Sequence, residues 1–209
     1  MSDIADDLIA RYPALVAVRE PLLEAAEMLL TCYHASGLIM TCGNGGSAAD
    51  SAHIVAELRK GFLSMRPLTA EETARFASLS AEDQALYARL QRGIRAVNLA
   101  EASGINTAVA NDQGADLVFA QSAFALGKPG DVLIGISTSG NSANVVHAMQ
   151  VARAQGILTI GLTGEAPCRM DALCDCQLRA PATETFLIQE YHLPIYHALC
   201  AIVERRLFS

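Results

Sequence analysis

Residues 38–60 read LIMTCGNGGSAADSAHIVAELRK, and this stretch decides the fold class. It opens on the short apolar run Leu38-Ile39-Met40-Thr41, which predicts a buried strand. The glycine-rich run Gly43-Asn44-Gly45-Gly46-Ser47 predicts a tight turn, and residues 48–60 have the apolar spacing of a helix. The stretch is therefore a strand, a turn and a helix in direct succession.

The same succession recurs further along the chain. Three more apolar runs predict strands, at residues 105–110, 132–136 and 158–162, and helices from about 116 to 126 and up to 154 follow the first two. Residues 176–179 predict a last strand, and residues 184–207 predict a long terminal helix. Such alternation is typical of an α/β domain, in which helices flank an open parallel sheet.

Two segments lie outside this alternation. Residues 1–36 have apolar residues at helical spacing, interrupted by Pro13 and Pro21, and predict a helical region. Residues 62–96 are charged and contain two helix-like pieces, 69–77 and 81–92, so they predict a helical insertion. The insertion follows the glycine-rich turn and would be able to cover a site there; a surface elaboration without a chemical role is the alternative. We expect a single domain over residues 1–209.

The composition excludes several classes of protein. The chain has 209 residues, 52% hydrophobic and 18% charged, as in soluble globular proteins. A net charge of −7 and a pI near 5.2 have the wrong sign for nucleic-acid binding. Residues 1–7 do not resemble a secretory signal, and no apolar run is long enough to cross a membrane. The six cysteines lack zinc-ribbon spacing and predict reduced thiols in a cytoplasmic protein.

Two of the predicted turns suit a phosphate group. In open α/β sheets, ligands lie beyond the carboxyl ends of strands, where turns present free N–H groups and the positive ends of helix dipoles. The turn at 44–47 has two glycines that let the backbone approach an anion, and the turn at 137–142 surrounds a helix start with hydroxyl groups. Helix capping alone is the alternative for the serines. Neither turn is a dinucleotide fingerprint or a Walker loop, so the sequence predicts a phosphorylated metabolite.

Two pairs of side chains could do chemistry. His53 and Glu57 project from one face of the helix after the glycine-rich turn, and Gln189 and His197 share a face of the terminal helix. Together they could hold a divalent ion such as zinc, or act without metal as general base and general acid. A solvated surface pair is the alternative for each pair alone. We expect the remaining histidines to be structural: His34, His147 and His192.

In combination, these motifs resemble the phosphoheptose isomerase family of the sugar isomerase (SIS) domain superfamily. The resemblance rests on Gly43 to Ser47 with His53 and Glu57, on Asn111-Asp112, on residues 135–142, and on Gln189-Glu190 with His197. It covers nearly the whole chain except the insertion. It is specific because SIS domains in general share the serine loop but not the His, Glu, Gln, His set. The resemblance implies a three-layer αβα, flavodoxin-like fold.

The resemblance also implies a reaction. Such enzymes convert D-sedoheptulose 7-phosphate into D-glycero-D-manno-heptose 7-phosphate through an enediol or enediolate, the first step toward heptose for bacterial surface polysaccharide. Glu57 would move the proton between two carbons, and His197 would serve the oxygens. One zinc ion per subunit would bind His53, Glu57, Gln189 and His197, in a homotetramer with shared sites. The residues expected to contact substrate are Asn44, Gly45, Gly46, Ser47, Glu57, Asn111, Asp112, Ser137, Thr138, Ser139, Ser142 and Gln189.

Two departures from the family pattern leave the substrate open. The insertion at 62–96 is longer than the family's usual connection, and Phe186-Leu187 stand where a polar residue and an arginine are expected. One alternative is therefore an isomerase or lyase for a different sugar phosphate. The other is a non-catalytic SIS protein that serves as a binding platform, and the presence of both Glu57 and His197 argues against it.

Overall fold

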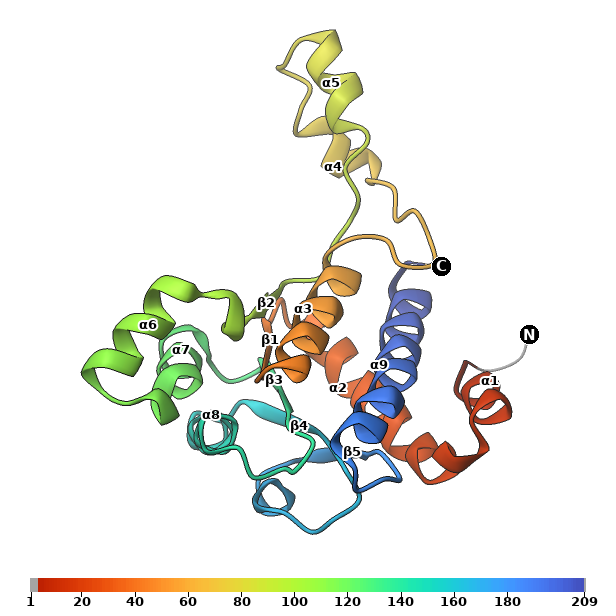
Figure 1. Cartoon of the computed structure of the whole chain (residues 1–209). Helices are drawn as coiled ribbons and strands as arrows, with labels where there is room; N and C mark the ends of the chain where they lie inside the picture. Colours follow the sequence, from red (N-terminus) through yellow and green to blue (C-terminus); the bar gives the residue numbers. More distant parts are fainter. Residues whose placement is uncertain (1–3, 209) are drawn as a thin grey trace.

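The computed structural model describes residues 4–208, and a parallel sheet lies at its centre (Figure 1). Within these residues the sheet has five strands in the order β2-β1-β3-β4-β5. The strands are β1 (Ile39–Gly43), β2 (Ala96–Asn98), β3 (Val132–Ile136), β4 (Leu158–Thr163) and β5 (Cys176–Arg179). Every neighbouring pair is parallel. This is the flavodoxin-like order, so the predicted fold class is confirmed.

Helices cover both faces of the sheet. Successive strand residues point to opposite sides, so each strand contributes residues to two cores. Ile39 and Ile134 belong to a core shared with α2 (Arg19–His34), α3 (Gly46–Arg59) and α9 (Thr185–Phe208). On the other face, Met40 and Leu133 pack with α7 (Val118–Leu126) and α8 (Ala143–Ala154). The inner strands β1 and β3 are buried throughout, as expected of a parallel sheet that is covered twice.

The N-terminal region is helical over its described residues. It consists of α1 (Ile4–Arg11), a short 3-10 helix (Pro13–Val18) and α2. Leu8, Leu15 and Leu22 are buried in the same core as α9. Residues 1–3 of this predicted region lie outside the described part of the chain.

The predicted strand at 105–110 is wrong, since these residues belong to α6 (Ser103–Asp112). Only Val109 of this helix is buried, and the Asn106 side chain donates hydrogen bonds to the carbonyl oxygens of Leu99 and Ala100. The strand lies upstream instead, as the three residues of β2 at the edge of the sheet. An edge strand this short pairs on one side only and leaves little apolar pattern to recognise.

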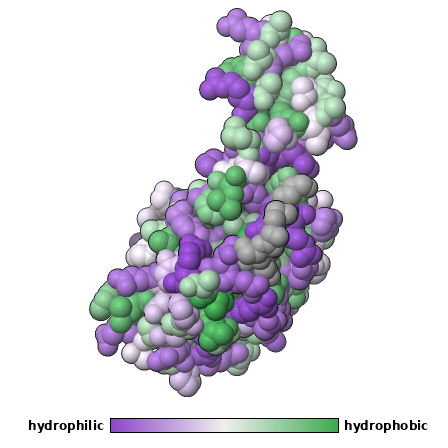
Figure 2. All heavy atoms as spheres, turned by 90° about the vertical axis from the view of Figure 1, so that its right-hand side faces the viewer, coloured by the Kyte–Doolittle hydropathy of each residue, from purple (hydrophilic) through white to green (hydrophobic). Residues whose placement is uncertain are grey.

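Between α3 and β2 the chain extends away from the sheet and returns (Figures 1 and 2). We call residues 67–91 the arm; its ends are joined by a bridge between Pro67 and Gln91. It contains two helices, α4 (Ala70–Ala74) and α5 (Ala81–Tyr87), which begin at side-chain caps from Thr69 and Ser80. Both are shorter than predicted, and none of the arm's described residues is buried.

Other short elements join these parts. They are three 3-10 helices, Leu99–Glu101, Ala115–Leu117 and Arg169–Ala172. None of the helices in residues 4–208 has the length and apolar content needed to span a membrane.

Candidate functional site

The two predicted phosphate turns lie side by side at the carboxyl edge of the sheet. β1 and β3 are neighbours, with Gly43 paired to Ile136, yet their following helices α3 and α8 pack on opposite faces. Such a switch in direction opens a crevice between the two turns, where open α/β sheets bind ligands. Asn44 and Asn144 link the turns through a reciprocal pair of amide hydrogen bonds, both 2.9 Å long.

The glycine-rich turn needs its glycines. Gly45 has a φ of 56°, a left-handed conformation that residues other than glycine rarely adopt. Gly46 lies directly against the side-chain amide of Gln189, so that a Cβ at this position would collide with it. The turn thereby brings Gln189, from the first turns of α9, next to the start of α3.

In the serine turn, hydroxyl groups face one another across the start of α8. The hydroxyls of Ser137 and Ser142 are 3.0 Å apart, and Ser139 Oγ accepts a hydrogen bond from the N–H of Asn141. Ser142 precedes α8, but its side chain makes no capping bond to the helix. The N–H of Val145 donates to Oδ1 of Asn144 at 3.0 Å, but the N-cap side chain satisfies none of the first N–H groups of α8, so the positive end of this helix suits an anion.

His53, Glu57 and His197 converge where α3 and α9 cross. Nε2 of His53 lies 3.1 Å from Oε1 of Glu57 and 3.4 Å from Nε2 of His197. The other carboxylate oxygen of Glu57, Oε2, is buried and has no hydrogen-bond partner among the described residues. Three of the four side chains in the two predicted pairs thus form one cluster, whereas Gln189 lies against Gly46.

Burial sets the electrostatics of this cluster. It lowers the pKa of the His197 imidazole, and the neighbouring His53 lowers it further, so His197 is neutral near pH 7. The ring of Phe62 lies 5.4 Å from that of His197, centroid to centroid. On its open side, His197 faces a cavity of about 560 Å³ that α1, Phe62 and Leu63 also line.

Two further residues of the cluster, Asp50 and Tyr196, escape sequence reasoning. The Tyr196 hydroxyl donates to Oδ1 of Asp50 at 3.3 Å, and its oxygen lies 3.0 Å from Nδ1 of His53. The contact with Tyr196 through Nδ1 orients the His53 ring so that its Nε2 faces Glu57 and His197. Only their positions in the sequence could have indicated these residues: Asp50 lies almost one helical turn before His53, and Tyr196 precedes His197.

Comparison with known proteins decides the family. The sequence pattern of the SIS domain matches residues 9–94 and 91–164. Phosphoheptose isomerase from Rhodospirillum rubrum is 40% identical over 90% of this chain and 87% of its own length. That from Aliarcobacter butzleri is 39% identical over 99% of this chain and 98% of its own. The chain belongs to the phosphoheptose isomerase family.

Solved structures of the phosphoheptose isomerase family have the same fold. The enzyme from Neisseria gonorrhoeae aligns with a TM-score of 0.75 and 35% identity, over 96% of this chain and 94% of that one. The enzyme from Francisella tularensis gives a TM-score of 0.77 and 27% identity, over 94% and 91%.

The donor atoms of the cluster suit a metal ion, although no three His, Cys, Asp or Glu side chains among residues 4–208 are arranged as a ready metal centre. Nε2 of His53 lies 3.1 Å from Oε1 of Glu57 and 3.4 Å from Nε2 of His197, and imidazole nitrogens together with a carboxylate are ligands that zinc accepts. Oε2 of Glu57, which has no hydrogen-bond partner among the described residues, is a further donor atom for an ion.

Other predicted site residues lie apart from this cluster. Asn111 and Asp112 are exposed at the end of α6, where Asn111 donates to Asp112 at 2.7 Å. Their contact with substrate stays a prediction. Phe186 is 61% exposed in the first turn of α9, on the helix that carries Gln189. His192 is buried, and its Nε2 contacts the carbonyl oxygen of Thr163 at 3.2 Å, as expected of a structural histidine.

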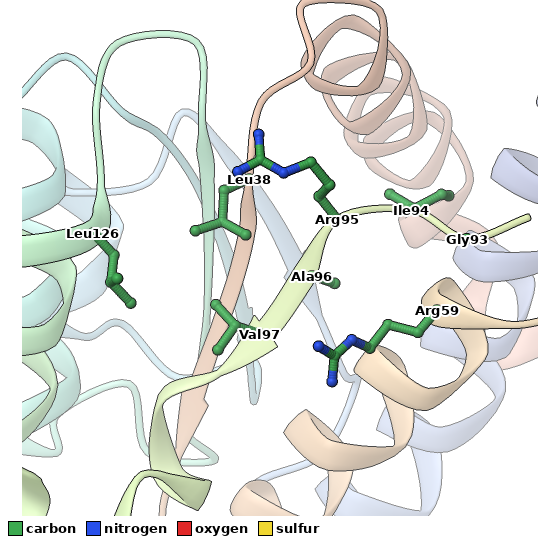
Figure 3. Close-up of a pocket in the computed structure, with 8 residues that line it drawn as sticks. All are labelled: Leu38, Arg59, Gly93, Ile94, Arg95, Ala96, Val97 and Leu126. Atoms are coloured by element: carbon green, nitrogen blue, oxygen red, sulfur yellow. The ribbon is translucent and has the colours of Figure 1, made fainter. Parts of the chain in front are cut away.

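A second cavity, of about 490 Å³, lies at the opposite edge of the sheet (Figure 3). Leu38, just before β1, and Ala96, the first residue of β2, line it together with Arg59 and Arg95. This is the amino-terminal edge of the strands. Ligands of open α/β sheets bind at the carboxyl edge, so we place the family's site at the two turns and not here.

Proposed function

We propose that this chain is an aldose–ketose isomerase that converts D-sedoheptulose 7-phosphate into D-glycero-D-manno-heptose 7-phosphate. One observation carries the proposal: His53 and Glu57 stand on α3, the helix that begins at a phosphate-type turn, and His197 of α9 joins them in one acid–base cluster. From Gly46 to His53 the axis of α3 rises about 10 Å. That separation suits a seven-carbon sugar whose phosphate binds at the turns while its first carbons reach the cluster.

The phosphate would be held without a positive side chain. The hydroxyls of Ser137, Thr138, Ser139 and Ser142 and the N–H groups at the start of α8 supply neutral donors and a favourable dipole. Gln189, beside Gly46, stands between the turns and the cluster and would orient the sugar hydroxyls. This binding would fix the reacting carbons against Glu57.

Isomerisation would then be a movement of protons. The Glu57 carboxylate takes the proton from C1 of the ketose, which gives an enediol or enediolate, and returns it to C2 to form the aldose. Neutral His197 exchanges protons with the oxygens on C1 and C2, so that O2 gains the proton that O1 loses.

We propose zinc, one ion per subunit, as the metal that this cluster would hold. His53, Glu57, His197 and the side-chain oxygen of Gln189 would be its ligands. When bound, zinc would supply Lewis acidity toward the carbonyl and hydroxyl oxygens. Glu57 would serve as a base only when it is free of the ion, because ligation weakens a carboxylate base.

We also propose a cytoplasmic homotetramer with sites shared between subunits. Support for sharing comes from the cavity beside His197, whose walls include exposed Leu63. Support for the compartment comes from the six cysteines, all within the described residues and all free. Light scattering of the purified protein tests the assembly, and a monomer with full activity would overturn it.

Turnover of sedoheptulose 7-phosphate by the purified protein tests the proposed reaction. We expect conversion by the wild type and losses on the order of 10² to 10⁴-fold in Glu57→Gln and in His197→Ala. Repeating the assay with chelator, and then with added zinc, tests the metal. A folded wild type that is inactive on this sugar but active on another phosphorylated ketose would overturn the substrate, and exposed Phe186 marks the place where specificity would differ.

A further inference from the structure

A buried ion pair lies behind the acid–base cluster, where the chain leaves α3 for the arm. Nε of Arg66 donates to Oε1 of Glu204 at 2.7 Å, and the two side chains are 0% and 3% exposed. Surface ion pairs contribute little to stability, whereas a buried pair persists only when its remaining polar atoms are satisfied. The partners of both side chains therefore show what the pair holds in place.

Glu204, on α9, accepts hydrogen bonds from three successive backbone N–H groups at the start of the connection. Its carboxylate receives the N–H groups of Phe62, Leu63 and Ser64 at 2.8, 2.7 and 3.1 Å. Burial by itself would raise the pKa of Glu204, but these hydrogen bonds and Arg66 outweigh it and lower the pKa. Glu204 is therefore a carboxylate that clamps this backbone, including Phe62, whose ring lies against His197.

Arg66 reaches the other side of the cluster. Its Nη1 donates to the carbonyl oxygen of Leu58 at 2.8 Å, and its Nη2 donates to that of Glu57 at 2.9 Å. Because α3 ends at Arg59, these carbonyls belong to the last turn and have no partner within the helix. The ring of Phe208 stacks on the guanidinium, with 4.8 Å between the ring centroid and Cζ of Arg66. Arg66 also keeps a φ of 44°, which a non-glycine residue adopts only where its surroundings enforce it.

We propose that Arg66 and Glu204 are positioning residues for the acid–base pair, a role that rests on the proposed function. Arg66 fixes the last turn of α3 and with it the Glu57 side chain, and Glu204 fixes both Arg66 and the Phe62 backbone beside His197. Lysine cannot replace Arg66 in this role, because a single ammonium group lacks the planar fork that reaches one carboxylate and two carbonyls at once.

Kinetics of Arg66→Lys and Glu204→Gln, each scaled to the folded fraction, test the proposal. Because displacements near 1 Å reduce catalysis on the order of 10²-fold, we expect kcat to fall by this factor while KM changes less than about threefold. Arg92→Lys is the matched control, since Arg92 also lies over the Phe208 ring, at 5.1 Å, but its side chain pairs with Glu72 of the arm, at 3.3 Å, and we expect wild-type kcat. Wild-type kcat in folded Arg66→Lys and Glu204→Gln would overturn the proposal.

A second readout separates this proposal from the proposed function. In metal-free protein at one fixed pH, we expect the imidazole NMR shifts of His53 and His197 to move in Arg66→Lys and not in Arg92→Lys. If these shifts move in Arg66→Lys while the wild type turns over no sugar phosphate, the proposed function is overturned and the positioning role is kept. Unmoved shifts in folded Arg66→Lys and Glu204→Gln would overturn the positioning role, whatever the wild type catalyses.

Discussion

Single side chains decide which protonation states the fold allows, and His192 is the clearest case. It is buried on α9 with one ring nitrogen against the carbonyl oxygen of Thr163. The other nitrogen, Nδ1, has no hydrogen-bond partner among the described residues. Burial lowers the pKa of His192 to about 4 from its ordinary 6.5, so the folded protein keeps this ring neutral.

Stability should therefore depend on pH through His192. The unfolded chain takes up a proton near pH 6.5 and the folded protein only near pH 4, so the free energy of unfolding falls as pH is lowered between these values. The loss amounts to about 3 kcal/mol and levels off below pH 4. Urea titrations from pH 7 to 4 should show this component in the wild type and lose it in His192→Gln. An equal pH dependence in both proteins would contradict it.

Tyr196 should tune zinc affinity if the cluster holds the proposed ion. Its hydroxyl contacts Nδ1 of His53 at 3.0 Å and orients the ring, and removal of such an outer partner lowers metal affinity by about 10 to 100-fold. We expect this loss for zinc in Tyr196→Phe, measured by calorimetry on chelator-treated protein. Tyr191→Phe, on the same helix, is the control and should bind zinc like the wild type. Equal affinities in Tyr196→Phe and the wild type would contradict the role of the hydroxyl.

At the scale of elements, sequence patterns predict four of the five strands among the described residues. β1, β3 and β4 are apolar runs followed by polar turns, and these runs lie where the patterns place them, as do the helices after β1 and β3. The edge strand β5 has the predicted bounds as well. β2 has three residues and one neighbour, so it carries no such pattern. The β-branched residues of 105–110 are typical of a strand, but in α6 only Val109 is buried in the protein core.

The candidate site, too, is predictable only where it depends on local spacing. His53 with Glu57 follows from helical spacing, whereas the meeting of α3 and α9 depends on packing between segments some 140 residues apart, which no local pattern encodes. For that reason Asp50, Tyr196 and the Arg66–Glu204 pair emerge only from the structure. The roles of the predicted substrate-binding residues stay predictions.

The contact between the glycine-rich turn and α9 makes a prediction at this scale. Gly46→Ala places a methyl group against the Gln189 amide, which is the far end of a flexible side chain, so we expect the amide to move aside at little cost in stability. Because Gln189 is then displaced from the turn, KM for the sugar phosphate should rise by roughly fivefold to a hundredfold. Gly104→Ala is the control, because its Cβ would meet no atom within 4 Å. An unchanged KM in Gly46→Ala would show that the turn tolerates the contact.

The whole molecule combines a buried core with an arm that stands outside it (Figure 2). None of the described residues 67–91 is buried, so the arm contributes little to the stability of the protomer. Replacing residues 68–90 with two glycines, between the bridged Pro67 and Gln91, should change the free energy of unfolding by no more than about 1 kcal/mol. Leu29→Ala, in the core, should lose about 2–5 kcal/mol in the same assay. A comparable loss on removal of the arm would mean that another copy buries it.

In the proposed reaction, Glu57 moves a proton between two carbons of a sugar phosphate bound at the two turns. Isomerisation in heavy water, followed by NMR, tests this step most directly. We predict that the wild type forms the aldose and that part of it carries solvent deuterium at C2, because the Glu57 carboxyl exchanges its proton with water before it returns one to C2. Glu57→Gln, equally folded, should form almost no aldose, and aldose formed by this variant at the wild-type rate would contradict the role of Glu57.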